Sequence, residues 1–149
     1  MEPELDVQYA SECGDLPKES DIARWAEAAL EGIKESIGIS VRIVDEAESA
    51  ELNRQYRNKS GPTNVLSFPF EDPPGVKSEI LGDLVICAPV VSREAQEQNK
   101  PEQAHWAHMV VHGIMHLRGY DHINDEDAGK MEKMETTILT RLGFDDPYA

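Results

Sequence analysis

All five histidines of this 149-residue chain lie in one short segment, AHWAHMVVHGIMHLRGYDH, at residues 104–122. The segment follows Pro101, a residue favoured in the first turn of a helix, and its apolar side chains recur around the whole cylinder. It therefore predicts a mostly buried helix from about residue 101 to residue 118. Its histidines step by three, four and four residues, which places four imidazoles on one stripe of the helix: His105, His108, His112 and His116.

The end of this helix predicts a metal site. Gly119 is the residue type that most often ends a helix in the left-handed conformation, and His122 follows it after the turn. The resulting spacing is H-x3-H-x5-H, from His112 through His116 to His122. Three neutral imidazoles leave the fourth position of a tetrahedral zinc ion open, as in catalytic zinc sites. The alternative for any histidine on an apolar helix is a hydrogen-bonded core residue. We prefer that role, or a contact with the metal ligands, for His105 and His108.

The residue after the first ligand argues against a peptidase. The spacing matches HExxHxxGxxH, in which the glutamate is the general base of zinc proteases, but this chain has Gly113 at that position. Glycine carries no proton acceptor, so a zinc peptidase-like hydrolase is the weaker interpretation. Because a mid-helix glycine costs about 1 kcal/mol relative to alanine, we expect Gly113 to allow a close approach by a substrate or another element.

Phosphodiester cleavage tolerates the missing glutamate better. It needs a cation beside the metal to stabilise the anionic transition state. The segment NRQYRNKSGPTNVLSF supplies Arg54, Arg57 and Lys59. Arg57 ends a predicted helix beside a loop and could lean over a site, or it could simply complement the helix dipole. The residues alone leave both possibilities open.

The rest of the chain predicts an α+β domain over residues 1–149, with a small mixed sheet of about four strands, about five helices, and the metal site at the end of a buried helix. We predict strands at 5–10, 40–45, 64–70 and 82–88, and helices at 20–37, 46–57, 89–98, 101–118 and 125–142. A proline-rich loop is expected at 69–79.

The net charge and the cysteine content restrict the expected class of function and the expected cellular location. The formal net charge is -15, which repels polyanions and argues against a dedicated nucleic-acid binder. No apolar segment is long enough to cross a bilayer, and the first residues do not resemble a signal peptide. Cys13 and Cys87 form no CxxC motif, so we predict reduced thiols, a cytoplasmic location and a buried, inert Cys87.

Three motifs together resemble a known family. HGIMHLRGYDH, YRNKSGPTNVLSFPF and LGDLVICAPVV are similar to the YbeY family of metal-dependent endoribonucleases, which mature ribosomal RNA and act in ribosome quality control. The resemblance implies one zinc ion held by His112, His116 and His122. The residues alone leave another first-row divalent metal open, because the same ligands bind several of these ions. The resemblance also implies that Arg57 is essential for cleavage, and we take Arg57 and His112 as the catalytic residues.

The resemblance also suggests the partners. It implies single-stranded ribosomal RNA as substrate and the small ribosomal subunit as the complex in which this acidic chain meets it. Asp121 and Asp83 are candidate acceptors for the zinc-bound imidazoles, although a turn residue and a strand-edge acid are equally good interpretations. A non-enzymatic ribosome-associated factor with a structural zinc remains the alternative.

Overall fold

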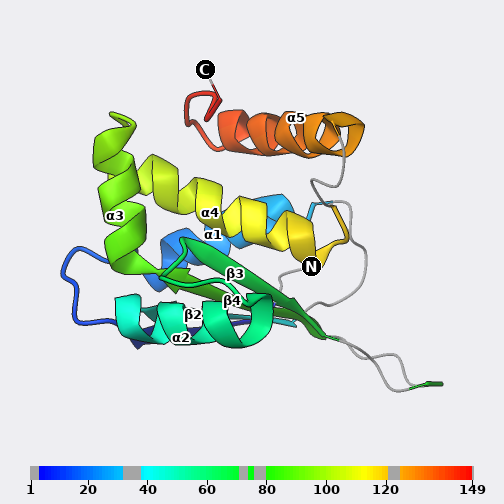
Figure 1. Ribbon diagram of the computed structural model, residues 1–149. Coiled ribbons are helices and arrows are strands. Elements are labelled where there is room, and N and C mark those ends of the chain that lie inside the picture. The colour runs from blue at the N-terminus through cyan, green and yellow to red at the C-terminus, as the bar shows by residue number, and fades with distance from the viewer. Residues whose placement is uncertain (1–3, 32–37, 71–73, 76–79, 121–124, 149) are drawn as a thin grey trace.

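The computed structural model describes residues 4–31, 38–70, 74–75, 80–120 and 125–148 (Figure 1). Within these ranges the elements follow the predicted order. The strands are β1 (Glu4–Ala10), β2 (Gly38–Val44), β3 (Val65–Pro69) and β4 (Ile80–Cys87). The helices are α1 (Glu19–Ala29), α2 (Glu46–Arg57), α3 (Ala88–Glu97), α4 (Glu102–Leu117) and α5 (Asp125–Arg141). The fold class and the two element counts of the prediction are confirmed.

The four strands form one mixed sheet in the order β1-β2-β4-β3. The first three strands are parallel, whereas β3 pairs antiparallel with β4, with Ser67 opposite Leu84. This order makes β3 an edge strand. The loop that enters β3 and the strand itself therefore lie at the margin of the sheet, where a site can open.

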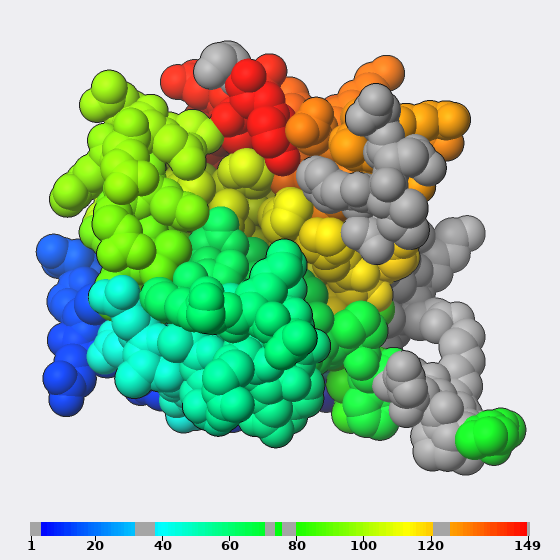
Figure 2. All heavy atoms as spheres, viewed as in Figure 1, coloured from blue at the N-terminus to red at the C-terminus, as the bar shows by residue number. Residues whose placement is uncertain are grey.

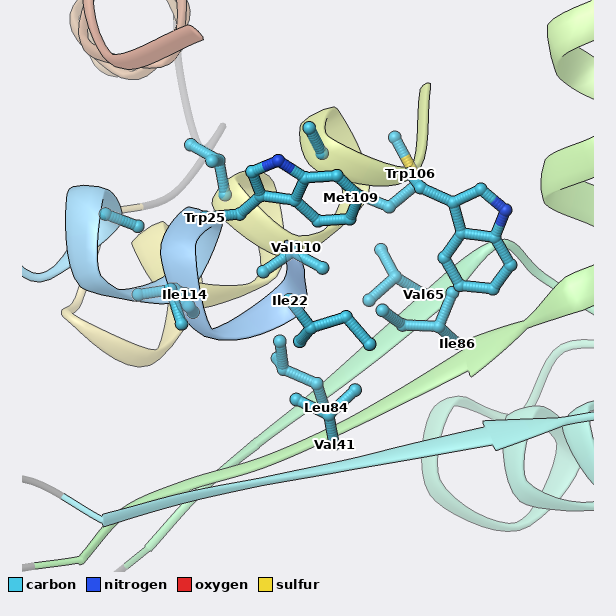
Figure 3. Close-up of a cluster of buried hydrophobic side chains, with 14 of the residues drawn as sticks. Ile22, Trp25, Val41, Val65, Leu84, Ile86, Trp106, Met109, Val110 and Ile114 are labelled. Atoms are coloured by element: carbon cyan, nitrogen blue, oxygen red, sulfur yellow. The ribbon is translucent and has the colours of Figure 1, made fainter. Parts of the chain in front are cut away.

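Helix α4 lies at the centre of the molecule. Figure 1 shows α1 and α4 on one face of the sheet, α2 on the other face, and α5 on the side of α4 that faces away from the sheet. Most residues of α4 are buried, which explains why its apolar side chains surround the cylinder. In Figure 3 its Trp106, Val110 and Ile114 meet Ile22 of α1 and Leu84 of β4 in the main hydrophobic core.

The first helix is shorter than predicted. The apolar periodicity suggested residues 20–37, but α1 ends at Ala29, and Leu30 already has a ψ angle of 4°. Gly32, a poor helix former, follows two residues later in the sequence. Residues 32–37, the last part of the predicted helix, lie outside the described ranges, as does most of the predicted loop at 69–79. Within the described ranges, none of the helices is both long and apolar enough to cross a bilayer.

Candidate functional site

The four histidines of α4 form the predicted stripe. Consecutive imidazole rings along the helix have centroid separations of 6.1, 6.1 and 4.6 Å from His105 to His116. The stripe faces α3 at its start, α5 along its middle and a surface pocket at its end. Each imidazole therefore meets a different environment.

At the start of the stripe, His105 is a structural residue. Its side chain is almost fully buried, and its Nε2–H donates to Oε1 of Glu94 on α3 at 2.9 Å. Glu94 also accepts a hydrogen bond from the side-chain amide of Asn64. Burial lowers the pKa of His105, although the hydrogen bond to Glu94 opposes that shift. A neutral imidazole that donates to a carboxylate fits the core role predicted for His105.

The middle of the stripe is built around Glu135, a fully buried carboxylate on α5. Its Oε1 accepts hydrogen bonds from Nε2 of His108 at 2.8 Å, Nδ1 of His112 at 3.1 Å and the hydroxyl of Tyr148 at 2.9 Å. Burial raises the pKa of Glu135, but the hydrogen bonds from His108 and His112 outweigh it and lower the pKa to about 2. The group is thus ionised, and it joins α4 to α5.

The end of the stripe has the geometry of a metal-ligand pair. Since His112 uses Nδ1 for Glu135, its Nε2 points the other way and lies 3.2 Å from Nε2 of His116. Two nitrogens bound to one tetrahedral zinc at about 2.0–2.1 Å lie roughly 3.3–3.4 Å apart, so this pair fits a zinc ion. The hydrogen bond to Glu135 is the kind of carboxylate contact that fixes the tautomer of a zinc-bound histidine. The predicted third ligand, His122, lies outside the described residues.

A second group could also hold a metal ion. One ligand atom from each of His108, His112 and Glu135 lies within 4.8 Å of the others. However, Glu135 is fully buried and His108 is nearly so. His112 is a member of both groups. His112 and His116 are both half-buried and line one pocket together, whereas Glu135 is fully enclosed by its neighbours.

Glycine is required at two positions of the motif, 113 and 119, for different structural reasons. A Cβ on Gly113 would lie 2.7 Å from a methyl carbon of Leu84 and 3.3 Å from one of Val65, so glycine lets α4 lie close against the sheet. The close approach to another element that we predicted is confirmed. Position 113 faces the sheet, so a larger side chain there would require the sheet or the helix to shift. Gly119 has the expected positive φ of 98°, and the amide of Tyr120 donates back to the carbonyl of Met115 to close the helix.

The pocket at the end of the stripe has a volume of about 600 Å³. Its walls come from the end of α2, the edge strand β3 and the end of α4, and the residues that line it are Tyr56, Arg57, Asn64, Val65, Leu66, Ser67, Phe68, Pro69, His112, His116, Gly119 and Tyr120. In Figure 2 the yellow atoms of α4 remain visible between those of α2 and α5. Arg57, His112 and His116, which are far apart in sequence, therefore share one pocket.

The structure distinguishes among the three candidate cations. Arg57 lines the pocket, is exposed, and forms no ion pair within the described ranges. Arg54 is instead engaged by Glu51 at 2.6 Å, one turn earlier on the outer surface of α2. Lys59 is exposed and does not line the pocket. Only Arg57 of these three is placed to contact a substrate beside the histidines.

Comparison with known proteins assigns the family. The family described as Endoribonuclease YbeY matches residues 8–143. The chain belongs to the YbeY family. Membership supports an endoribonuclease role, in the processing of ribosomal RNA. The chain is also similar to the solution structure of TM1509 from Thermotoga maritima, a NESGC target protein. The two are 25% identical, with a TM-score of 0.58 over 95% of this chain and 97% of the other.

One predicted contact of the site is wrong. Asp83 was a candidate acceptor for the imidazoles, but it is exposed, whereas the next residue, Leu84, is buried beneath Gly113 of α4. Because side chains alternate along a strand, Asp83 points to the sheet face opposite α4. Asp121, the other candidate, lies outside the described residues.

Sequence reasoning missed the acceptor that the structure provides, Glu135. A signal for it existed. Glu135 stands four residues after Met131 and four before Leu139, both fully buried on α5, so it occupies a core position of that helix. A carboxylate at a core position requires a partner, and imidazoles on a neighbouring helix are suitable donors.

Proposed function

We propose that this chain, as one domain over residues 1–149, is a zinc-dependent endoribonuclease that cuts single-stranded RNA in the pocket between β3 and α4. One observation carries the proposal: Arg57 lines the same pocket as the paired Nε2 atoms of His112 and His116. A cation beside a metal site is the combination that phosphodiester cleavage requires.

His112, His116 and His122 would hold the zinc ion. When bound, zinc supplies a Lewis acid that withdraws charge from a phosphate and lowers the pKa of water. Glu135 orients His112 for this function. It accepts a hydrogen bond from Nδ1 of His112, so the lone pair on Nε2 of His112 is directed toward the pocket. Gly113 brings no base, so the assembly suits phosphate chemistry better than peptide hydrolysis.

Arg57 would clamp the scissile phosphate. A guanidinium can donate two parallel hydrogen bonds to phosphate oxygens, and these strengthen as charge builds up in the transition state. The exposed position of Arg57 at the C-terminal end of α2 allows its side chain to reach a substrate in the pocket. Arg57 is therefore the residue on which cleavage should depend most, apart from the metal ligands.

The negative charge of the chain affects the form in which it can bind RNA. With a net charge of -15, affinity for free RNA should be weak and should fall further as salt rises. We propose that the substrate is ribosomal RNA presented by the small ribosomal subunit in the cytoplasm, and that cleavage serves rRNA maturation and ribosome quality control. Tight, salt-insensitive binding of free RNA by the isolated protein would contradict this assignment.

Cleavage of a labelled single-stranded RNA tests the proposal. The protein is stripped with chelator, reloaded with zinc and compared with Arg57→Ala and Arg54→Ala variants purified in the same way. We expect zinc-dependent cutting that Arg57→Ala reduces by about 100-fold or more while zinc stays bound. Arg54→Ala should cut normally, because Arg54 pairs with Glu51 outside the pocket.

Two results would overturn the proposal. Equal cutting by wild type and Arg57→Ala would point to a contaminating nuclease. No cutting by any zinc-loaded sample, combined with a loss of stability on chelation, would favour the non-enzymatic ribosome factor in which zinc only fastens the end of α4.

A further inference from the structure

The pocket has an aromatic wall beside its cation. Tyr56 precedes Arg57 on the last turn of α2 and lines the same pocket. It is 60% exposed, more than any other large hydrophobic side chain within the described ranges. Exposed tyrosines are common singly, but this one stands at the mouth of a pocket beside the proposed phosphate contact.

The ring of Tyr56 is also held in place. It packs against Phe68 of β3 with a centroid separation of 5.0 Å and an interplanar angle of 70°. Phe68 in turn packs on the buried cluster that includes Leu66 and Val85, beneath α2. This edge-to-face contact anchors one side of the tyrosine and leaves much of its surface open to solvent. A ring held in this way loses little entropy when a flat ligand stacks on it.

We propose that Tyr56 is the stacking platform for one unpaired RNA base, next to the phosphate that Arg57 contacts. The inference rests on the proposed nuclease function and specifies its substrate: a nucleotide whose base is not paired in a helix. Successive residues on α2 then recognise the two parts of one nucleotide, the aromatic ring its base and the guanidinium its phosphate. Recognition of splayed, unpaired bases by aromatic side chains is the common mode for single-stranded RNA.

Stacking also answers a problem that the charge of the chain creates. A net charge of -15 repels RNA at long range, so short-range contacts must hold the substrate. Contact between a base and an aromatic face depends little on salt, unlike contact with phosphate. Removing such a platform weakens binding by roughly 5- to 150-fold.

A fluorescent variant tests the platform directly. The two native tryptophans, Trp25 and Trp106, are only 1% and 3% exposed, so in a Tyr56→Trp variant the new indole is the one that reaches solvent. We expect a short single-stranded oligoadenylate to quench its emission and an abasic ribose-phosphate oligomer of the same length to leave it unchanged. Equal quenching by both oligomers, or no quenching by either, would overturn the proposal.

Kinetics give an independent measurement. Tyr56→Ala should raise KM for single-stranded RNA by roughly 5- to 150-fold with little change in kcat, whereas Tyr56→Phe should retain the wild-type KM. Tyr9→Ala is the matched control, because Tyr9 is 46% exposed on β1 at the opposite edge of the sheet. An unchanged KM in Tyr56→Ala would contradict the platform.

The two failures are distinguishable. Wild-type protein that cuts RNA, together with an unquenched Tyr56→Trp indole and an unchanged KM in Tyr56→Ala, overturns the platform and leaves the nuclease assignment standing. Wild-type protein that cuts no RNA with any metal overturns the nuclease assignment itself, and with it the base-binding role that depends on it.

Discussion

The first and last histidines of the α4 stripe lie on the same helix face but have different environments. His105 is almost fully buried and its Nε2 is bound to Glu94, whereas His116 is half-buried and its Nε2 faces Nε2 of His112 across 3.2 Å. The difference arises from the neighbours. Helix α3 brings a carboxylate to the start of the stripe, while the end of the stripe opens into the pocket.

Glu135 lies between these two halves and serves both. It accepts hydrogen bonds from His108, which is buried, and from His112, which lines the pocket. An imidazole becomes available to a metal when one nitrogen is fixed by a carboxylate and the other is left toward an open space. The comparison therefore predicts that substitutions along one stripe separate into effects on stability and effects on metal binding.

The largest expected effect is the loss of zinc in His116→Ala. Removing one of the three proposed ligands should reduce bound zinc well below one ion per chain and abolish zinc-dependent cleavage. The unfolding free energy of the metal-free protein should change by at most about 1 kcal/mol, because the side chain is half-buried at a pocket. Zinc per chain is measured by atomic emission after gel filtration, and stability by urea unfolding of the stripped protein. Full zinc content in this variant would disprove the ligand assignment.

The next effect is the destabilisation caused by Glu135→Ala. Without the carboxylate, the buried His108 loses its charged partner and α5 loses its polar link to α4. We expect the metal-free protein to lose about 3–5 kcal/mol of unfolding free energy, measured by urea unfolding, because two hydrogen bonds to a charged group are lost. Zinc affinity should also fall about 10- to 100-fold, because His112 loses the acceptor that orients it.

Tyr148→Phe is the control for that experiment. It removes the hydroxyl that donates to Glu135 and lies 3.2 Å from Nε2 of His108, and it leaves the contacts of both histidines with Glu135 in place. A small change in the unfolding free energy of Tyr148→Phe, together with a large change for Glu135→Ala, would assign the loss of stability to the histidine contacts. Comparable losses in the two variants would assign it to the C-terminal contact instead.

The smallest of the three effects is expected for His105→Ala. It leaves Glu94 with the amide of Asn64 as its remaining side-chain donor within the described ranges, and it creates a small cavity at the start of α4. The cost should be about 1–3 kcal/mol, with one zinc ion per chain retained. Differential scanning calorimetry and zinc content are measured on the same samples. A loss of zinc here would mean that the two halves of the stripe are not separate.

The features predictable from the sequence were those that depend on local spacing. The steps of three and four residues place the imidazoles on one face, Gly119 ends the helix in the left-handed region, and the order of strands and helices follows from apolar periodicity. Gly113 was also informative, because a glycine in place of the catalytic glutamate weakens the peptidase interpretation whatever the fold.

Other features depend on residues that meet only after folding. Glu135 is one of 29 acidic residues, and nothing in its immediate neighbours connects it with a histidine 23 or more positions earlier. Asp83 looked equally suitable beside its strand, yet the alternation of the strand turns it away from α4. Arg54 and Arg57 are both arginines near the end of the same helix, so the sequence does not distinguish them. Only the placement of α2 beside β3 brings Arg57 to the pocket.

By itself the sequence determined the histidine stripe, the end of its helix and the α+β class, because each depends on backbone geometry over a few residues. Tertiary structure alone decided which carboxylates pair with the stripe, which arginine faces the pocket and what the glycine at position 113 makes room for. These depend on the packing of helices and strands distant in the chain, where hydrogen bonds and close contacts are satisfied between elements rather than within them.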